Sequence, residues 1–245
     1  MRYLILSDIH ANLQALDAVL AAAPSPEWDH VVVLGDLVGY GADPNGVIDR
    51  LKELLPLAII RGNHDKAACG LDDGSSFNNV ARMAAAWTSE TLTPGNRDYL
   101  RSLPAGPMSI DHLLEICHGA PYDEDHYIFN GDDAVRGLEA ARRPLCLFGH
   151  THLPVAFERD RAKLGGFAPE EDTELELRAG ATYLVNPGSV GQPRDGDPRA
   201  AFAILDVDAR VLTLRRVEYA VGAAQRRILE AGLPTSLANR LAIGR

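Results

Sequence analysis

Five short, mainly apolar runs in this sequence each end abruptly in Asp, Asn or His, and this feature limits the possible folds more than any other. The runs cover residues 3–7, 31–34, 57–60, 113–117 and 145–148. A short apolar run that stops at a polar turn is typical of a buried strand. Sites in open α/β sheets are built in the loops just past the carboxyl ends of the strands. We therefore expect the polar residues that follow these runs to gather, and they are Asp8, His10, Asp36, Asn63, His64, Asp65, His118, His150 and His152.

The first 65 residues alternate between strand and helix patterns. Apolar residues recur at helical spacing in 11–23 and 44–55, and Pro24 and Pro56 end the two helices. Residues 62–65 follow the third strand, and we expect a tight-turn loop there. The resulting order β-α-β-α-β implies parallel strands joined by right-handed crossovers.

The second half of the chain has an antiparallel character. Residues 107–117 predict a hairpin with a two-residue link, and 165–172 is most simply a solvated hairpin tip. Further strands are expected at 155–158, 174–178, 183–186, 200–207 and 211–218, and helices at 132–141, 221–230 and 235–241. Together these elements predict an α/β protein, a four-layer α/β/β/α sandwich of two mixed sheets. We expect one sheet to be mostly parallel and the other mostly antiparallel.

Residues 66–105 interrupt this order with two predicted helices. A chain of 245 residues suits one large domain with a modest insertion. We therefore expect a single domain over 1–245, with a helical insertion at about 66–105. The insertion follows Asn63 and His64 directly, so it either packs onto the body of the protein or forms a wall over the site. Packing onto the body is the simpler expectation.

Charge and cysteine content exclude several classes of protein. The formal net charge of −10 argues against a general nucleic-acid-binding surface, because backbone phosphates require a basic footprint. Cys69, Cys117 and Cys146 are odd in number and widely spaced, which argues against a disulfide framework and for a reducing compartment. No apolar run reaches the length of a membrane span, and the first predicted strand leaves no room for a signal peptide. We expect a cytoplasmic protein.

The polar residues at the strand ends have the chemistry of metal ligands. Carboxylates, imidazoles and an amide without any thiolate suit Mn²⁺, Fe or Zn²⁺ better than a structural thiolate zinc site. Taken alone, each histidine is more simply a buried core residue and each aspartate a turn residue. Jointly, seven ligands are too many for one tetrahedral ion but suit two ions that share a carboxylate, about 3.5–4 Å apart. These seven are Asp8, His10, Asp36, Asn63, His118, His150 and His152.

The sequence around these ligands resembles a known family. The blocks Asp8-x-His10, Gly35-Asp36, Gly62-Asn63-His64-Asp65, His118 and Gly149-His150-x-His152 are similar, in order, to the signature blocks of the calcineurin-like metallophosphoesterase superfamily. The segment Asn186-Pro187-Gly188-Ser189 resembles the small bacterial phosphodiesterase branch. The resemblance implies the same four-layer sandwich. It also implies a dinuclear-metal-dependent phosphoesterase, most simply a phosphodiesterase that hydrolyses a small or nucleotide-like ester through a metal-bridging hydroxide.

The resemblance also implies a role for each residue. Asp8, His10 and His152 would hold the first ion. The second would be held by Asn63, His118 and His150, with Asp36 bridging the two. His64 would stay free of metal and give a proton to the leaving group, with Asp65 behind it as an orienting carboxylate.

Three other functions share this fold. A protein serine/threonine phosphatase would have the same metal site but usually a longer peptide groove, and a nuclease would need a basic surface. A non-catalytic protein-binding scaffold would lack His64 or a ligand, all of which are present here. Three nearby residues each leave two options open. Arg61 contacts substrate phosphate or pairs with a local carboxylate, whereas Tyr40 and Arg194 overhang the metals or face solvent.

Overall fold

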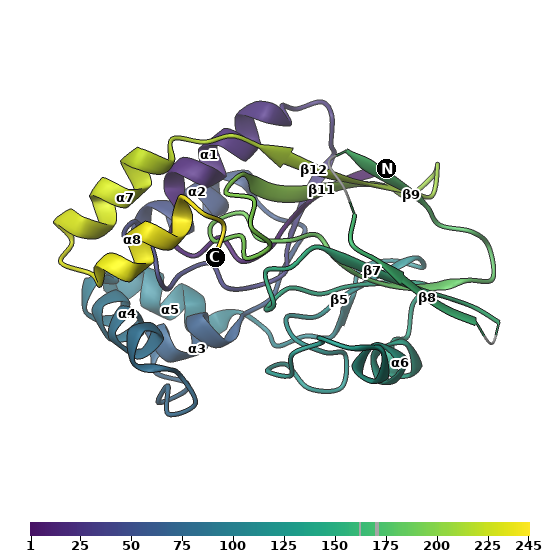
Figure 1. Cartoon of the computed structure of the whole chain (residues 1–245), viewed down its shortest axis with the longest axis horizontal. Coiled ribbons are helices and arrows are strands. Elements are labelled where there is room, and N and C mark those ends of the chain that lie inside the picture. Colours follow the sequence, from purple (N-terminus) through teal and green to yellow (C-terminus); the bar gives the residue numbers. More distant parts are fainter. Residues whose placement is uncertain (162, 170–171) are drawn as a thin grey trace.

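The computed structural model describes residues 1–161, 163–169 and 172–245 and contains two six-stranded sheets packed face to face (Figure 1). The first sheet has the strand order β3 (Ala58–Ile59), β2 (His30–Val33), β1 (Arg2–Leu6), β11 (Ala200–Asp206), β12 (Val211–Val217), β9 (Thr173–Glu176). The second has the order β4 (Met108–Ser109), β5 (Leu114–Ile116), β6 (Leu145–Leu147), β10 (Thr182–Asn186), β7 (Val155–Asp160), β8 (Lys163–Phe167).

Both sheets are mixed, which confirms the predicted fold class. Strands β1, β2 and β3 are parallel, as the β-α-β-α-β order requires. Our division into a mostly parallel and a mostly antiparallel sheet was wrong. Strand β1 is nearly all buried and pairs on its second edge with β11, so the late antiparallel strands extend the first sheet. Strands β5, β6 and β10 are parallel and form the centre of the second sheet.

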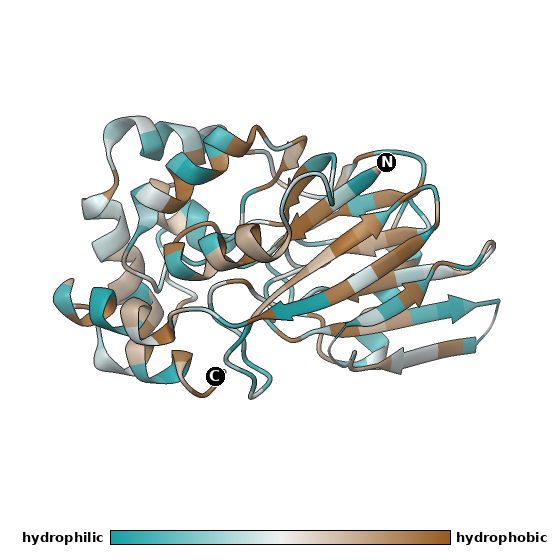
Figure 2. Ribbon diagram, turned by 90° about the horizontal axis from the view of Figure 1, so that it is seen from above, coloured by the Kyte–Doolittle hydropathy of each residue, from teal (hydrophilic) through white to brown (hydrophobic). Residues whose placement is uncertain are grey.

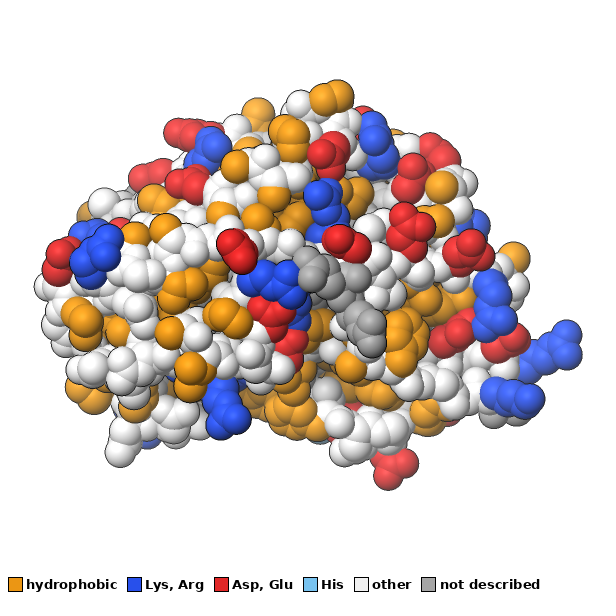
Figure 3. Space-filling view, turned by 45° about the horizontal axis from the view of Figure 1, so that its top comes forward, with side chains coloured by type: hydrophobic (Ala, Val, Ile, Leu, Met, Phe, Trp, Pro, Cys, Tyr) orange, Lys and Arg blue, Asp and Glu red, His pale blue; other side chains and the backbone are white. Residues whose placement is uncertain are grey.

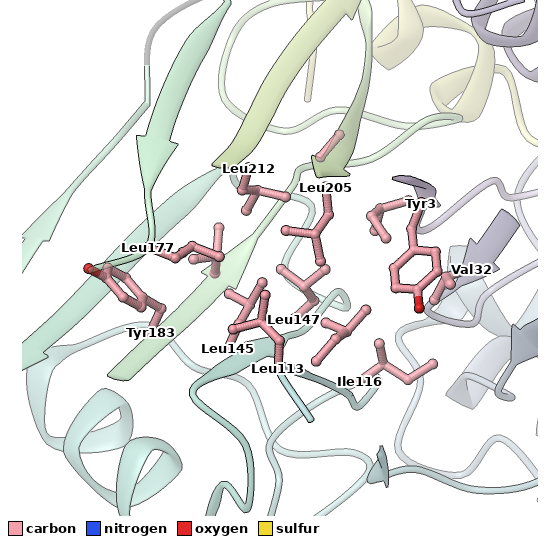
Figure 4. Packing of buried hydrophobic residues seen from close by; sticks show 14 of the residues in the cluster. Tyr3, Val32, Leu113, Ile116, Leu145, Leu147, Leu177, Tyr183, Leu205 and Leu212 are labelled. Atoms are coloured by element: carbon pink, nitrogen blue, oxygen red, sulfur yellow. The ribbon is translucent and has the colours of Figure 1, made fainter. Parts of the chain in front are cut away.

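The main core lies between the sheets. Successive residues of a strand point to opposite faces, so Tyr3 and Ile5 face the second sheet while Leu4 and Leu6 face the helices. Figure 4 shows side chains from the two sheets meeting across this core. In Figure 2 the longest hydrophobic stretches lie on the strands. Burial on both faces explains why these strands are continuous apolar runs.

Helices cover the outer face of each sheet. The first sheet is covered by α1 (Leu13–Ala22), α2 (Pro44–Leu54), α3 (Asn63–Cys69) and α5 (Pro94–Ser102), and the second by α6 (Gly131–Ala140). Helix α4 (Asn79–Thr91) packs against α7 (Val221–Glu230) and α8 (Thr235–Leu241) at one end of the molecule (Figure 1). The predicted insertion packs onto the body, and its residues 72 and 76–78 also line a cavity beside His64, so it forms a wall of the site as well. We propose that 1–245 forms one domain.

Three local predictions were wrong. The hairpin within residues 107–117 forms, but Ile110 donates to the Leu114 carbonyl, so the link is 111–113 and not two residues. Residues 62–65 do not form an open loop, because α3 begins at Asn63 and the Asp65 carboxylate accepts a hydrogen bond from the Gly62 N–H at 2.9 Å. Residues 163–167 form the exposed edge strand β8 beside β7, although glycine is a weak strand former. The other part of the predicted tip, at 170–171, lies outside the described residues. Within the described ranges, no helix is long and apolar enough to span a membrane.

Candidate metal centre

The predicted ligands converge where the strands of both sheets end. Asp8 and His10 follow β1, Asp36 follows β2, and Asn63 opens α3 just after β3. From the second sheet, His118 follows β5, and His150 and His152 follow β6. Six of the seven are buried, and Asn63 is half-buried. Two groups form, Asp8 with His10, Asp36 and His152, and Asp36 with His118 and His150; in each group one potential ligand atom per residue lies within 4.8 Å of the others.

In the first group two histidine nitrogens face each other. His10 Nε2 lies 3.0 Å from His152 Nε2 and 3.5 Å from Asp36 Oδ2. The Nδ1 atoms of the two rings lie 3.0 and 2.7 Å from the carbonyl oxygens of Val38 and Gln192. A carbonyl accepts only, so each Nδ1 carries the proton and each Nε2 presents a lone pair. Two lone pairs at this distance require a proton or a cation between them.

The second group is oriented in the same way. His118 Nδ1 donates to the Leu34 carbonyl at 2.9 Å, which turns Nε2 toward Asp36 Oδ2 at 3.4 Å and Asn63 Oδ1 at 3.2 Å. His150 Nε2 donates to the Asp125 carbonyl at 3.1 Å and leaves Nδ1 free as a ligand atom. Asp36 belongs to both groups, so it is the carboxylate that two ions would share.

The electrostatics of the site suit cations. Burial lowers the pKa of His10, His150 and His152 well below the usual value, so these imidazoles are neutral, the form that binds metal. Burial alone would raise the pKa of Asp36, but the surrounding histidines, His118 first, hold it well below its usual range. Burial also opposes a charge on His118, yet Asp36 and Asp8 raise its pKa to about 10. The buried carboxylates of Asp36 and Asp8 thus stabilise a positive charge beside them, here the proton on His118.

Five of the predicted ligand residues have strained backbones. Residues other than glycine rarely adopt positive φ, which costs about 1–2 kcal/mol each. Such strain persists only where the surroundings fix the chain, and here the loops interlock: the His150 N–H donates to Asp8 Oδ1 at 3.0 Å and the His10 N–H to the Asp36 carbonyl at 3.0 Å. The strained residues are Asp8 (52°), His10 (50°), Asp36 (51°), His150 (66°) and His152 (61°).

Glycines precede three of the ligands for a steric reason that our sequence argument missed. A Cβ on Gly62 would lie 2.1 Å from Asp36 Oδ1. A Cβ on Gly149 would lie 2.2 Å from Ser7 Oγ and 2.7 Å from Asp8 Oδ2. The signal was visible in the sequence, because Gly stands directly before Asp36, Asn63 and His150.

The expected contact between Asp65 and His64 is not formed. Adjacent residues of a helix do not face each other, and the Asp65 carboxylate instead accepts from the N–H groups of Gly62 at 2.9 Å and Val38 at 3.1 Å. In the described part of the chain, His64 Nδ1 is buried without a hydrogen-bond partner. The His64 ring stacks on Phe77 at 4.5 Å, and burial lowers its pKa to about 4.

A cavity of about 350 Å³ opens beside the two groups. Tyr127, which our sequence argument did not single out, stacks on His150 at 3.7 Å in this cavity. Tyr40 lies over the site, with its ring 4.8 Å from that of His10. Of the two roles considered for Arg61, the structure shows the pairing with a local carboxylate, because its guanidinium lies 3.1 Å from Glu124. The cavity lining includes Tyr40, Asn63, His64, Phe77, Tyr127 and His150.

Comparisons with known proteins identify the family. The model of the calcineurin-like phosphoesterase superfamily domain matches residues 1–210. The chain is 32% identical to the uncharacterized protein MJ0912 of Methanocaldococcus jannaschii, covering 98% of this chain and 97% of that protein. It is 27% identical to the phosphodiesterase YfcE of Escherichia coli, covering 85% and 89%.

Comparison with solved structures gives the same result. The crystal structure of a metallophosphoesterase from Sphaerobacter thermophilus has a TM-score of 0.90 and 42% identity, over 100% of this chain and 99% of that one. A hypothetical protein from Pyrococcus horikoshii, at 22% identity and a TM-score of 0.80 over 100% and 98% of the two chains, shares the fold. The chain therefore belongs to the calcineurin-like phosphoesterase superfamily.

Proposed function

We propose that the protein is a phosphodiesterase that hydrolyses a small or nucleotide-like phosphate ester with two divalent metal ions. The observation that carries this proposal is the pair of ligand groups that share Asp36. Membership of a phosphoesterase family and similarity to a phosphodiesterase support the reaction class. The net charge of −10 argues against a long nucleic acid as substrate, and so do the acidic side chains among the basic ones on the face in Figure 3, because such a substrate requires a basic surface. Both observations support a small substrate.

We assign the ligands as the sequence suggested. Asp8, His10 and His152 would hold one ion, the second would be held by Asn63, His118 and His150, and Asp36 would contact both. Nitrogen and oxygen donors without thiolate suit Mn²⁺, Fe or Zn²⁺. Ions bound there would supply Lewis acidity, which lowers the pKa of water and neutralises charge on the phosphoryl oxygens.

His64 would act as the proton donor to the leaving alkoxide, a contribution of about 10²–10⁴-fold. Its ring lines the cavity, and Nδ1 is buried and unpartnered within the described residues. Burial keeps the pKa of His64 low, but an anionic phosphate beside the ring favours the charged imidazolium. Proton donation is therefore coupled to substrate binding.

Asp65 would act as a positioning residue. Its carboxylate joins the start of α3 to the loop after β2, through the N–H groups of Gly62 and Val38. The same loop gives His10 its carbonyl acceptor at Val38. Asp65 thus acts on the histidines through the backbone.

The test is a metal titration followed by an activity screen. We expect metal-free protein to bind two equivalents of Mn²⁺ per chain and then to hydrolyse bis-p-nitrophenyl phosphate. Asp36→Asn should lower both stoichiometry and rate. His112→Asn is the matched control, because His112 is exposed and lies at the other end of β5 from His118. A Mn²⁺-loaded protein that cleaves only phosphopeptides, or no ester at all, would contradict the proposal.

A further inference from the structure

The His64 imidazole has no polar contact that fixes its orientation. Its Nδ1 is buried without a hydrogen-bond partner within the described residues, and the Asp65 carboxylate is bonded to backbone N–H groups instead. A Cβ on Gly39 would lie 2.5 Å from Nδ1, so the backbone of Gly39 closes that edge of the ring. Nε2 is therefore the nitrogen that can reach a substrate in the cavity. The torsion that turns an imidazole ring is broad, so packing has to hold the ring in this orientation.

Aromatic rings surround the His64 ring at centroid distances of 4.3, 4.5 and 5.0 Å, and they belong to Tyr40, Phe77 and His10. The Tyr40 ring is tilted by 50° and is itself held in the body of the protein, where the guanidinium carbons of Arg194 and Arg240 lie 5.6 and 5.9 Å from its centroid. The Phe77 ring is nearly parallel to that of His64, at 27°. A parallel ring this close resists rotation of the imidazole, because rotation would drive the imidazole edge into the Phe77 face.

The loop before α4 fixes the place of Phe77. Asn78 caps α4 by accepting from the Ala81 N–H at 3.0 Å, and the Phe77 N–H donates to the Gly74 carbonyl at 3.0 Å. An apolar residue just before such a cap often packs on the fourth residue of its helix. Here that residue is Arg82, which donates to the Phe77 carbonyl at 2.9 Å and so holds its backbone. The Phe77 ring is thus left available to stack on the site.

We propose that Phe77 is a positioning residue for His64, and that its ring holds the imidazole with Nε2 toward the cavity. Without the Phe77 ring the imidazole can turn, and fewer molecules present the proton to the leaving oxygen. The insertion at 66–105 then contributes to catalysis through Phe77. This inference rests on the proposed function, because it acts through the proposed proton donor.

Two diesters with different leaving groups test the inference. The Mn²⁺-loaded full chain is assayed at saturation with bis-p-nitrophenyl phosphate and with diphenyl phosphate, whose phenolate needs a proton more because its pKa is about 10, as for tyrosine. In Phe77→Leu we expect kcat on diphenyl phosphate to decrease about 10-fold, the upper end of what one aromatic pair contributes. On bis-p-nitrophenyl phosphate kcat should change less than about 2-fold. The ratio of the two rates does not depend on how much of a variant is folded.

Phe129→Leu is the matched control. The Phe129 side chain is exposed and stacks on Tyr127 at 5.2 Å, so the same substitution there should keep the wild-type ratio. If Phe77 acts through His64, Phe77→Leu should leave the ratio unchanged in a His64→Ala background. A further decrease in that background, or a higher KM on both esters with the wild-type kcat ratio, would overturn the inference.

Nuclear magnetic resonance of the metal-free chain gives a readout independent of turnover. An aromatic ring shields the protons of a group stacked on its face, so the His64 imidazole protons should move downfield in Phe77→Leu and stay unchanged in Phe129→Leu. Unchanged His64 resonances in Phe77→Leu would also overturn the inference. The downfield shift without hydrolysis of any ester would support the packing of Phe77 on His64 and overturn the proposed function.

Discussion

Replacing Gly62 with alanine is expected to disrupt the metal centre, although alanine fits the backbone there. Gly62 has φ −107° and ψ −179°, an extended conformation that any residue adopts. An added Cβ would lie 2.1 Å from Asp36 Oδ1 and 2.6 Å from the Asp36 backbone nitrogen, whereas ordinary contact begins at 3.4 Å. Because one obstacle is backbone, a new rotamer of Asp36 cannot relieve the clash. The loop after β2 has to move away from α3.

The size of the effect follows from this displacement. Overpacking a closely packed region costs about 1–3 kcal/mol. In a protein of this size, each kcal/mol lowers the melting temperature by about 2–4 °C, so we expect a decrease of about 2–12 °C. Asp36 is the carboxylate shared by the two ligand groups. A misplacement of about 1 Å at a reacting centre lowers the rate by roughly 10²-fold.

The measurement compares two alanine variants. Gly62→Ala and Gly95→Ala are purified, stripped of metal and titrated with Mn²⁺, and their melting temperatures and ester hydrolysis are recorded. Gly95 lies in α5 with no atom within 4 Å of its added Cβ, so Gly95→Ala should bind Mn²⁺ and hydrolyse the ester as the wild type does, and it should melt no lower, because alanine favours a helix more than glycine does. If Gly62→Ala binds two equivalents of Mn²⁺ and melts within about 1 °C of the wild type, the steric argument is wrong.

Three further changes have defined outcomes. His64→Ala should keep both metal equivalents and lower kcat about 10²–10⁴-fold on esters with poor leaving groups, because only the proton donor is lost. Lys66→Met removes the buried cation that contacts Asp125 at 2.6 Å and should lower the free energy of unfolding in urea by about 1–3 kcal/mol. Removing both ions, each held at 100 times its Kd, should cost about 2.7 kcal/mol per ion, or about 5–10 °C of melting temperature for each.

Each of these has a control. Undiminished turnover or loss of metal in His64→Ala would exclude its role as proton donor. Lys163 is an exposed lysine on β8, so Lys163→Met should leave the urea midpoint unchanged. An equal decrease of the midpoint in both lysine variants would contradict the argument that the Lys66 ion pair stabilises the protein because it is buried. Asp36→Asn should make the melting temperature less sensitive to chelator than that of the wild type. An Asp36→Asn protein that is as sensitive as the wild type would place the ions elsewhere.

Much of the fold followed from local patterns in the sequence. The runs that became β1 and β6 are buried on both faces, so they are apolar without interruption and could be recognised as strands. Which sheet a strand joins depends on contacts distant in sequence, and nothing within residues 200–206 reveals that β11 pairs with β1. Strand β8 was missed because Gly165 and Gly166 are weak strand formers.

That the predicted ligands gather in space followed from the same rule, since sites form just past the carboxyl ends of the strands, here of both sheets. The contacts of each side chain did not follow. Asp65 is next to His64 in sequence, but the helix that begins at Asn63 turns the two side chains apart. Arg240 could not be placed beside Tyr40, because only the packing of α4 against α7 and α8 brings the end of the chain to the site.

Because the predicted ligand residues are strained, we expect binding of the proposed ions to be coupled to folding. Five ligand residues have positive φ, at about 1–2 kcal/mol each, which together is comparable to the net stability of about 5–15 kcal/mol of a typical protein. Two further costs are the buried carboxylates of Asp8 and Asp36 and the facing lone pairs of His10 and His152. Cations between these groups would remove both costs and would bind only the arrangement in which the five residues are strained. The apolar core between the sheets therefore holds a site that the bound ions would stabilise in turn.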